Sequence, residues 1–331
     1  MTGIDVAIPN YNYGRFLASC VASILRQGEG VSRILIIDNA STDGSQEIMR
    51  ALARTDPRIE LRLREQNLGP HASFNEAVDW ARSDHFTILC ADDLLPAGAL
   101  GRAMAIMDDD PATVMVFGRT AFVPAGHSLH DLPDTPLEEA PYRLFTGTEF
   151  LERVCRTGRS PVGGPTTVVR TIAQKRAGHY SASLAHTDDA EMWMRLACLG
   201  SIAEVDAVLS IARLHSNNQS AVLSNVHLWN VEMERTFEFF FNGKGAALPE
   251  AHRLHVAARR SLAARAYWCA LSHLVRHEPG AGALFAHALR LRPALALVPP
   301  VASLFDRDDA GRKVRRTLMS VLGLRPASPP A

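Results

Sequence analysis

The most informative part of this sequence for fold class and function is the stretch Phe86-Thr87-Ile88-Leu89-Cys90-Ala91-Asp92-Asp93. It is an apolar run that stops at two adjacent carboxylates. A buried strand of this kind places Asp92 and Asp93 at the carboxyl edge of a sheet, where open α/β sheets bind their ligands. Carboxylate oxygens are ligands that suit Mg²⁺ and Mn²⁺. The plainer alternative is the start of a loop, because Asp is common in turns.

The first 120 residues alternate between strand-like and helix-like patterns. Short β-branched or apolar runs occupy residues 4–8, 34–37, 59–63, 86–89 and 114–117. Helical patterns between them cover residues 16–25, 73–81 and 98–107. Strands separated by helices of this length indicate βαβ units. We therefore predict an α/β fold with a mostly parallel sheet flanked by helices.

The second part of the chain is less regular. Residues 124–141 carry many turn-forming residues and predict a long loop. Thr146 and Glu149 have the spacing of a capping box and predict a helix that continues through Val154. Further elements are expected as a strand at 166–170, a helix at 188–199 and a strand at 207–214. The composition then predicts a helical region at 216–325 and a disordered tail at 326–331.

Composition narrows the class of protein. The 331 residues are 47% apolar and 21% charged, as in an ordinary globular protein. Basic and acidic residues balance at 35 each, so nucleic acid is not expected as a partner. The five scattered cysteines favour a reducing cytoplasm over a zinc site or a disulfide framework. Neither a signal peptide nor a membrane span is expected, since even residues 284–305 are interrupted by charges and prolines.

Four polar segments are expected where predicted strands end. They are residues 8–13, 37–44, 67–70 and the Asp92-Asp93 pair. Tyr11 in the first segment can offer a flat face to a base. Asp38 in the second can accept a hydrogen bond from a pyrimidine ring N–H, although it can equally cap the loop that follows, and Asp43-Gly44 has the form of a turn.

In this order and spacing, the four segments resemble the family 2 glycosyltransferases, inverting enzymes of the GT-A fold that use nucleotide sugars. The resemblance covers residues 4–215 and implies a nucleotide-binding half at 1–120 and an acceptor half at 121–215. It implies that the nucleotide sugar, a UDP-sugar by default, contacts Pro9, Tyr11, Asn12, Asp38, Asn67, Ala91 and Asp92. It also implies that Asp93 binds Mn²⁺ or Mg²⁺. Two positions depart from the family: Cys90 replaces a usual acidic residue, and Asn39 replaces a second Asp.

A second group of candidate residues lies at 188–196, on an expected helix. Asp189 and Trp193 are four residues apart and share one face, where Trp193 can wall a sugar site. The family's E/D-D motif implies that Asp189 is the general base that activates the acceptor. Its neighbour Asp188 is interpreted more simply as the N-cap of the helix.

Glu191 and Arg195 have the spacing of an ion pair on the surface of that helix. His215 ends the next predicted strand, as in the family's H-x-x-N/S segment. The resemblance implies a diphosphate or metal contact for His215, whereas a lone His is more often structural or a surface residue.

The resemblance therefore implies an inverting, metal-dependent glycosyltransferase whose acceptor is a glycan or lipid-linked glycan in bacterial surface polysaccharide or glycoconjugate assembly. The main alternative is an inactive carbohydrate- or nucleotide-binding scaffold of the same fold. A nicotinamide-dependent enzyme would need G-x-G-x-x-G after the first strand, which this chain lacks. Residues 311–322 join basic and apolar residues at helical spacing. We hypothesise that they bring this cytoplasmic protein to the inner face of a membrane; packing on the protein body is the alternative.

Overall fold

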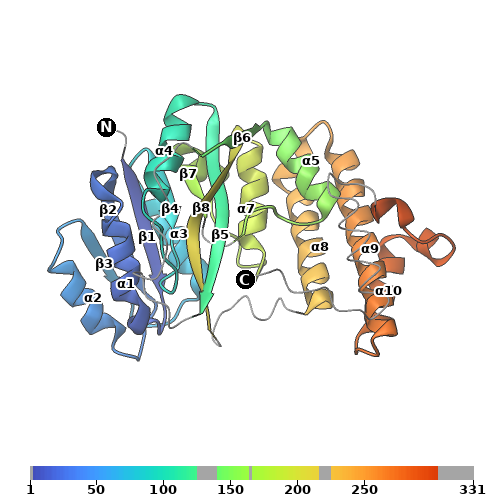
Figure 1. The fold of residues 1–331 in the computed structure, drawn as a ribbon, viewed down its shortest axis with the longest axis horizontal. Coiled ribbons are helices and arrows are strands. Elements are labelled where there is room, and N and C mark those ends of the chain that lie inside the picture. Colours follow the sequence, from blue (N-terminus) through green and yellow to red (C-terminus); the bar gives the residue numbers. More distant parts are fainter. Residues whose placement is uncertain (1–2, 125–139, 164–165, 216–224, 305–331) are drawn as a thin grey trace. The chain divides into compact units, whose positions relative to one another are not determined.

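The structure is a computed structural model that describes residues 3–124, 140–163, 166–215 and 225–304. The chain forms two compact units (Figure 1). The sheet unit comprises Met1–Phe150 and Pro161–Asn218, and the helical unit comprises Leu151–Ser160 and Gln219–Ala331. The functional boundaries predicted at residues 120 and 215 stay predictions. The predictions for residues 311–322 and 326–331 lie outside the described residues.

The sheet unit is built on a mixed sheet in which parallel pairing dominates. Its strands are β1 (Ile4–Asn10), β2 (Val31–Asp38), β3 (Ile59–Leu63), β4 (His85–Ile88), β5 (Thr113–Pro124), β6 (Tyr142–Phe145), β7 (Val168–Arg170) and β8 (Ser201–Leu214). Their order is β3-β2-β1-β4-β7-β5-β8-β6, with β7 antiparallel to both of its neighbours and β6 antiparallel to β8. The predicted α/β fold is confirmed, and the carboxyl ends of β1, β2, β4 and β8 meet at one edge.

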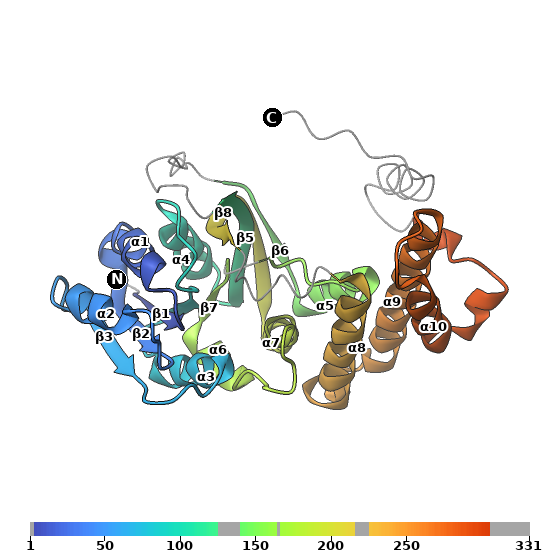
Figure 2. The same cartoon turned by 90° about the horizontal axis from the view of Figure 1, so that it is seen from below.

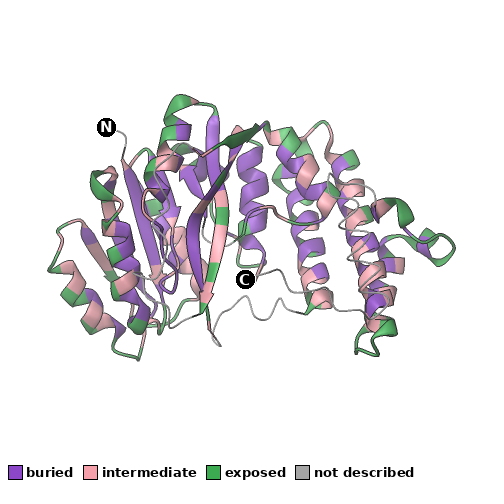
Figure 3. Cartoon of the chain, in the orientation of Figure 1, coloured by how far each residue is buried: buried purple, intermediate pink, exposed green. Residues whose placement is uncertain are grey.

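Helices cover both faces of this sheet. They are α1 (Gly14–Leu25), α2 (Ser45–Ala53), α3 (Pro70–Trp80), α4 (Ala99–Asp109), α5 (Gly147–Thr157), α6 (Thr171–Ala177) and α7 (Asp188–Ala197). Helices α1 and α4 lie on one face and α3, α6 and α7 on the other (Figure 2). Because both faces are covered, β1 and β2 are buried along most of their length, as Figure 3 shows.

The helical unit contains α8 (Val226–Asn242), α9 (Ala251–Val275) and α10 (Ala281–Leu291), together with the end of α5. The predicted helical character is thus confirmed for its described residues. Phe237, Phe240, Leu262 and Leu284 are almost completely buried in it. Among the described residues, no helix is both long enough and apolar enough to span a bilayer.

Several predicted elements differ from the observed ones at their ends. The first strand was expected at residues 4–8, but β1 continues to Asn10 and Pro9 pairs in register with Ile37. Strand β5 runs on to Pro124 because its partly exposed second half pairs with β8. Helix α6 was not predicted, since it has only two turns. The capping box is confirmed: the hydroxyl of Thr146 accepts from the N–H of Glu149 at 3.2 Å, and the Glu149 carboxylate accepts from the N–H of Thr146 at 2.8 Å.

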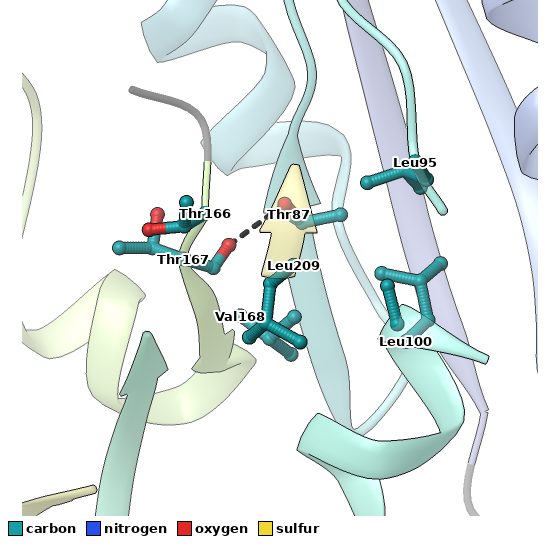
Figure 4. A pocket seen from close by; sticks show the side chains of 8 residues that line it. Thr87, Leu95, Leu100, Thr166, Thr167, Val168 and Leu209 are labelled. Atoms are coloured by element: carbon teal, nitrogen blue, oxygen red, sulfur yellow. Dashed lines mark hydrogen bonds between the residues drawn. The ribbon is translucent and has the colours of Figure 1, made fainter. Parts of the chain in front are cut away.

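A narrow gap inside the sheet unit contains no ionisable group. Figure 4 shows its lining residues: Thr87, Leu95, Ala99, Leu100, Thr166, Thr167, Val168 and Leu209. The hydroxyl of Thr87 donates to the carbonyl of Thr167 at 2.8 Å. We regard this gap as a feature of core packing, and the titratable candidate residues lie instead at the strand ends.

Candidate active site

The acidic turn, residues Cys90–Asp93, follows β4. The N–H of Asp93 donates to the carbonyl of Cys90 at 3.0 Å, which reverses the chain. The Cys90 sulfur and one carboxylate oxygen from each of Asp92 and Asp93 all lie within 4.8 Å of one another. Both carboxylates are largely buried, and Ala91, between Cys90 and Asp92, is fully buried. The predicted strand-end position of Asp92 and Asp93 is therefore observed.

Arg213, near the end of β8, holds this turn in place. Its N–H donates to Oδ1 of Asp93 at 3.3 Å, and its Nη1 donates to the carbonyl of Asp92 at 2.8 Å. Its Nη2 donates to the hydroxyl of Ser19 on α1 at 2.7 Å. Arg213 is only 3% exposed, so these bonds are shielded from water. Arg213 was not among the predicted site residues; the available signal was the single charge in the strand predicted at 207–214.

His215 follows β8 and contacts the acidic turn directly. Its Nε2 lies 3.0 Å from Oδ2 of Asp92. The ring stacks on Phe16 with centroids 5.2 Å apart and meets the edge of Tyr13 at 5.4 Å. The end of β8 thus supplies a polar partner to Asp92. The implied metal or diphosphate contact of His215 stays a prediction.

The electrostatics of the turn suit a divalent cation. Burial, followed by the negative charge of Asp92, raises the pKa of Asp93 to about 8, against the opposing influence of Arg213. Two buried carboxylates at this spacing repel each other when both are ionised, and a divalent cation would remove that repulsion. Two oxygen donors and one sulfur donor form a chemically suitable ligand set.

Asp38 joins the loops that follow β1 and β2. Its Oδ1 accepts from Nδ2 of Asn10 at 2.9 Å, and its Oδ2 accepts from the N–H of Ser41 and from Nε2 of Gln46, each at 3.0 Å. The side chain is fully buried. The alternative interpretation of Asp38 as a loop cap therefore has direct support, while its contact with a base stays a prediction.

The same two loops are tied together at Asn12. This residue has a φ of 58°, in the left-handed region that Asn tolerates. Its Oδ1 accepts from the N–H of Thr42 at 2.8 Å, and its N–H donates to the hydroxyl of Ser41 at 2.9 Å. Pro9 is half-buried within β1, whereas Tyr11 is 46% exposed. Tyr11 therefore offers an accessible aromatic ring among the residues predicted to contact the nucleotide sugar.

Asn39 explains one departure from the family pattern. Its Nδ2 donates to Oδ1 of Asn67 at 2.6 Å, and its Oδ1 accepts from the N–H of Leu68 at 2.9 Å and from Nη1 of Arg64 at 3.1 Å. An ionised Asp here could not donate to Asn67. The amide at position 39 therefore fixes the predicted nucleotide contact Asn67 from the neighbouring loop.

Helix α7 brings Asp189 to the same edge of the sheet. Only residues 198–200 separate α7 from β8. Asp189 is exposed, yet the surrounding protein limits its hydration and raises its pKa. Burial, followed by the charges of Asp93 and Asp92, raises the pKa of the Cys90 thiol, and the charge of Asp189 adds to this effect. The acidic turn and the predicted base are thus within electrostatic reach of each other.

Two interpretations of the residues next to Asp189 are wrong. Thr187, not Asp188, is the N-cap residue of α7; Asp188 is buried with Oδ2 at 3.3 Å from Nε2 of His71. Trp193 was expected to wall a sugar site but is only 6% exposed, because α7 is buried on nearly all sides. Helical spacing alone does not reveal how many faces of a helix are covered.

The Glu191–Arg195 pair is also buried rather than on the surface. Both carboxylate oxygens of Glu191 lie 2.9 Å from Nε of Arg195. The guanidinium also donates to the carbonyls of Ala177 and His179 at 2.5 and 2.8 Å. This pair fixes the chain ahead of α7, so the Glu191 carboxylate is already engaged.

The mixed, mostly parallel sheet flanked by helices and followed by C-terminal helices is the architecture of the GT-A glycosyltransferase fold. Two solved structures share it. The mannosyltransferase PcManGT of Pyrobaculum calidifontis, in complex with GDP-Man and Mn²⁺, matches with a TM-score of 0.55 and 19% identity over 97% of this chain and 85% of that one. TarS 1-349 of S. aureus, in complex with UDP-GlcNAc, matches with a TM-score of 0.54 and 16% identity over 89% of this chain and 91% of that one.

Residues 5–160 match the family model described as glycosyl transferase family 2. An uncharacterised glycosyltransferase of Rickettsia conorii is 27% identical over 213 residues, which are 64% of this chain. The match spans only 33% of that relative's length. The predicted resemblance to this family is confirmed for residues 5–160.

Proposed function

We propose that the protein is an inverting, metal-dependent glycosyltransferase that transfers a sugar from a nucleotide sugar to an acceptor hydroxyl. One observation carries the proposal: the turn after β4 gathers the Cys90 sulfur and carboxylate oxygens of Asp92 and Asp93 within 4.8 Å of one another, which suits a cation that binds a diphosphate. A glycan or lipid-linked glycan of bacterial surface polysaccharide or glycoconjugate assembly is the proposed acceptor.

The donor would lie across the ends of β1, β2 and β4. The exposed ring of Tyr11 offers a flat surface for the base, and the loop fixed by Asp38 and Asn12 borders it. A UDP-sugar is the first donor to test, as TarS is described with UDP-GlcNAc. A GDP-sugar is the second, because PcManGT is described with GDP-Man.

Asp93 would hold Mn²⁺ or Mg²⁺, Asp92 would contact the ribose or the diphosphate, and His215 would contact the same ion or the diphosphate. A cation bound there neutralises the charge that develops on the diphosphate leaving group. Arg213 supports this role by fixing the turn through its backbone N–H and guanidinium.

Asp189 would take the proton from the acceptor hydroxyl as that oxygen attacks the anomeric carbon. Its raised pKa makes it a better proton acceptor near neutral pH than an ordinary Asp. Glu191 is engaged by Arg195, which leaves Asp189 as the accessible carboxylate. Because the acceptor oxygen attacks the anomeric carbon directly and no covalent intermediate forms, the reaction is a single displacement. A single displacement inverts the anomeric configuration.

A panel of nucleotide sugars with Mn²⁺ tests the proposal. Release of free nucleotide should require both the cation and an acceptor, and the matching donor at 100 times its Kd should add about 2.7 kcal/mol of stability. A nucleotide sugar that stabilises the protein but is never turned over, with any acceptor supplied, would favour the inactive scaffold instead.

A further inference from the structure

Cys90 contributes a sulfur atom to a site at which the family usually has a carboxylate. The thiol is half-buried and lies in the acidic turn, with its sulfur within 4.8 Å of oxygens from both Asp92 and Asp93. The ligand set therefore mixes one soft donor with two hard ones. Cations differ strongly in their response to this mixture, because sulfur favours Zn²⁺ and other thiophilic ions whereas carboxylates suit Mg²⁺ and Mn²⁺.

The backbone holds the thiol beside the carboxylates. The carbonyl of Cys90 accepts from the N–H of Asp93 at 3.0 Å and from the thiol of Cys20 at 3.6 Å. Oδ1 of Asp93 is itself fixed by the N–H of Arg213. The first two bonds hold the backbone of the turn at Cys90 and the third orients the Asp93 carboxylate, so the turn is formed before any ligand arrives. Preorganisation of this kind lowers the cost of binding.

We propose that Cys90 is a ligand of the bound cation together with Asp92 and Asp93, and that it shifts the cation preference of the site from Mg²⁺ toward thiophilic ions. The inference rests on the proposed function, because it concerns the same cation. As the sulfur–metal bond forms, the thiol proton leaves to solvent, so no oxidant or reductant is involved. The site would accept Mn²⁺ and bind Cd²⁺ or Co²⁺ more tightly than an all-oxygen site does.

Spectroscopy on the full chain gives a readout that is independent of catalysis. Co²⁺ added to the native protein with UDP should produce the near-ultraviolet charge-transfer absorption of a sulfur–cobalt bond. Cys90→Ser should lose this absorption. Cys198→Ser is the matched control: Cys198 is exposed at the end of α7, so its substitution should leave the signal unchanged.

Calorimetry then compares affinities for Cd²⁺, Mn²⁺ and Mg²⁺. Cys90→Ser should bind Cd²⁺ at least about 10-fold more weakly, with a much smaller change for Mn²⁺. Cys90→Asp, which restores the usual acidic residue, should gain affinity for Mg²⁺ and lose it for Cd²⁺. Circular dichroism of both variants checks that they are folded.

The outcomes separate the two proposals. In one outcome, cation binding depends on Asp93, the sulfur absorption is absent, and Cd²⁺ affinity is equal in the native protein and in Cys90→Ser. This outcome overturns the role of Cys90 and leaves the proposed function standing. No binding of any of these cations in the presence of UDP overturns both.

Discussion

Nε2 of His215 lies 3.0 Å from Oδ2 of Asp92, although 123 residues separate them in the chain. The contact joins the end of β8 to the turn after β4, next to the bonds that Arg213 makes to the same turn. One side of the acidic turn is therefore built by a strand that follows it far along the sequence.

Asp93→Ala should abolish metal-dependent nucleotide binding while the fold remains intact. The raised pKa of Asp93 means that its negative charge is unfavourable beside Asp92 in the folded protein. Removing the Asp93 carboxylate should therefore leave the metal-free protein about as stable as before. Calorimetry with Mn²⁺ and UDP measures the loss. Asp206→Ala, which removes an exposed carboxylate on β8, serves as the control. Unchanged Mn²⁺-dependent affinity in Asp93→Ala would exclude Asp93 as a ligand.

Asp189→Asn should lower the rate of sugar transfer at least roughly 10²-fold with little change in donor affinity, because it keeps the shape and removes the proton acceptor. Initial rates and thermal shifts with the donor measure the two effects. Glu191→Gln is the comparison, and it should cost on the order of 3–5 kcal/mol of stability because Arg195 loses its buried partner. If Asp189→Asn transfers sugar at a near-normal rate while Glu191→Gln is folded but inactive, Glu191 is the general base instead of Asp189.

Asp188→Asn should change how stability depends on pH. Burial, followed by the charges of Asp189 and Glu191, raises the pKa of Asp188 from 3.8 to about 7. A raised carboxyl pKa means that the folded state binds the proton more tightly. The stabilisation is therefore complete below pH 3.8 and is lost as the pH rises through about 7.

Urea unfolding across this range measures that dependence. Between pH 4 and pH 8, the native protein should lose on the order of 2–4 kcal/mol of stability relative to Asp188→Asn. Parallel stability curves for the two proteins would show that Asp188 does not titrate in this way. Asp189 keeps its own raised pKa in both proteins, so a smaller common slope is expected.

Asp38→Ala should lower stability by about 1–3 kcal/mol, since three donors lose their buried acceptor. Asn10→Ala removes one of those donors. It is the matched control for the effect that less ordered loops alone would have on UDP binding. If Asp38 also contacts the base, its removal should weaken UDP binding well beyond the effect of Asn10→Ala. Equal losses of UDP affinity in the two variants would reduce Asp38 to a loop-forming role.

Deletion of residues 311–322 should reduce sedimentation of the protein with anionic vesicles, because the stretch joins basic to apolar residues. The segment lies outside the described residues, and the prediction rests on sequence alone. High salt should reduce binding by the full chain and leave the deletion variant unchanged. Equal partitioning of both proteins would refute the membrane contact.

Local sequence patterns predicted the features that depend on neighbouring residues. The apolar run at 59–63 coincides with β3, and the spacing of Thr146 and Glu149 correctly marked a helix start. The placement of Asp92 and Asp93 after β4 follows from the same kind of signal, an apolar run that ends in carboxylates.

Features that depend on distant partners could not be predicted in this way. The bonds of Arg213 to the acidic turn join positions that only the completed sheet brings together. The Glu191–Arg195 spacing predicted a pair but not its burial, which results from packing around α7. Strand β7, which pairs antiparallel between β4 and β5, has only three residues, too few for its direction to be predicted from sequence.

The late position of β8 has a consequence for biosynthesis. During translation, the acidic turn leaves the ribosome long before the 123 residues that end at His215 have been added. Until β8 pairs with β5, the two carboxylates lack the partners that hold them, and pairing across such a sequence separation is slow. The nascent chain can thus form β1 to β4 early, and we expect it to become able to retain a cation only when the sheet is completed.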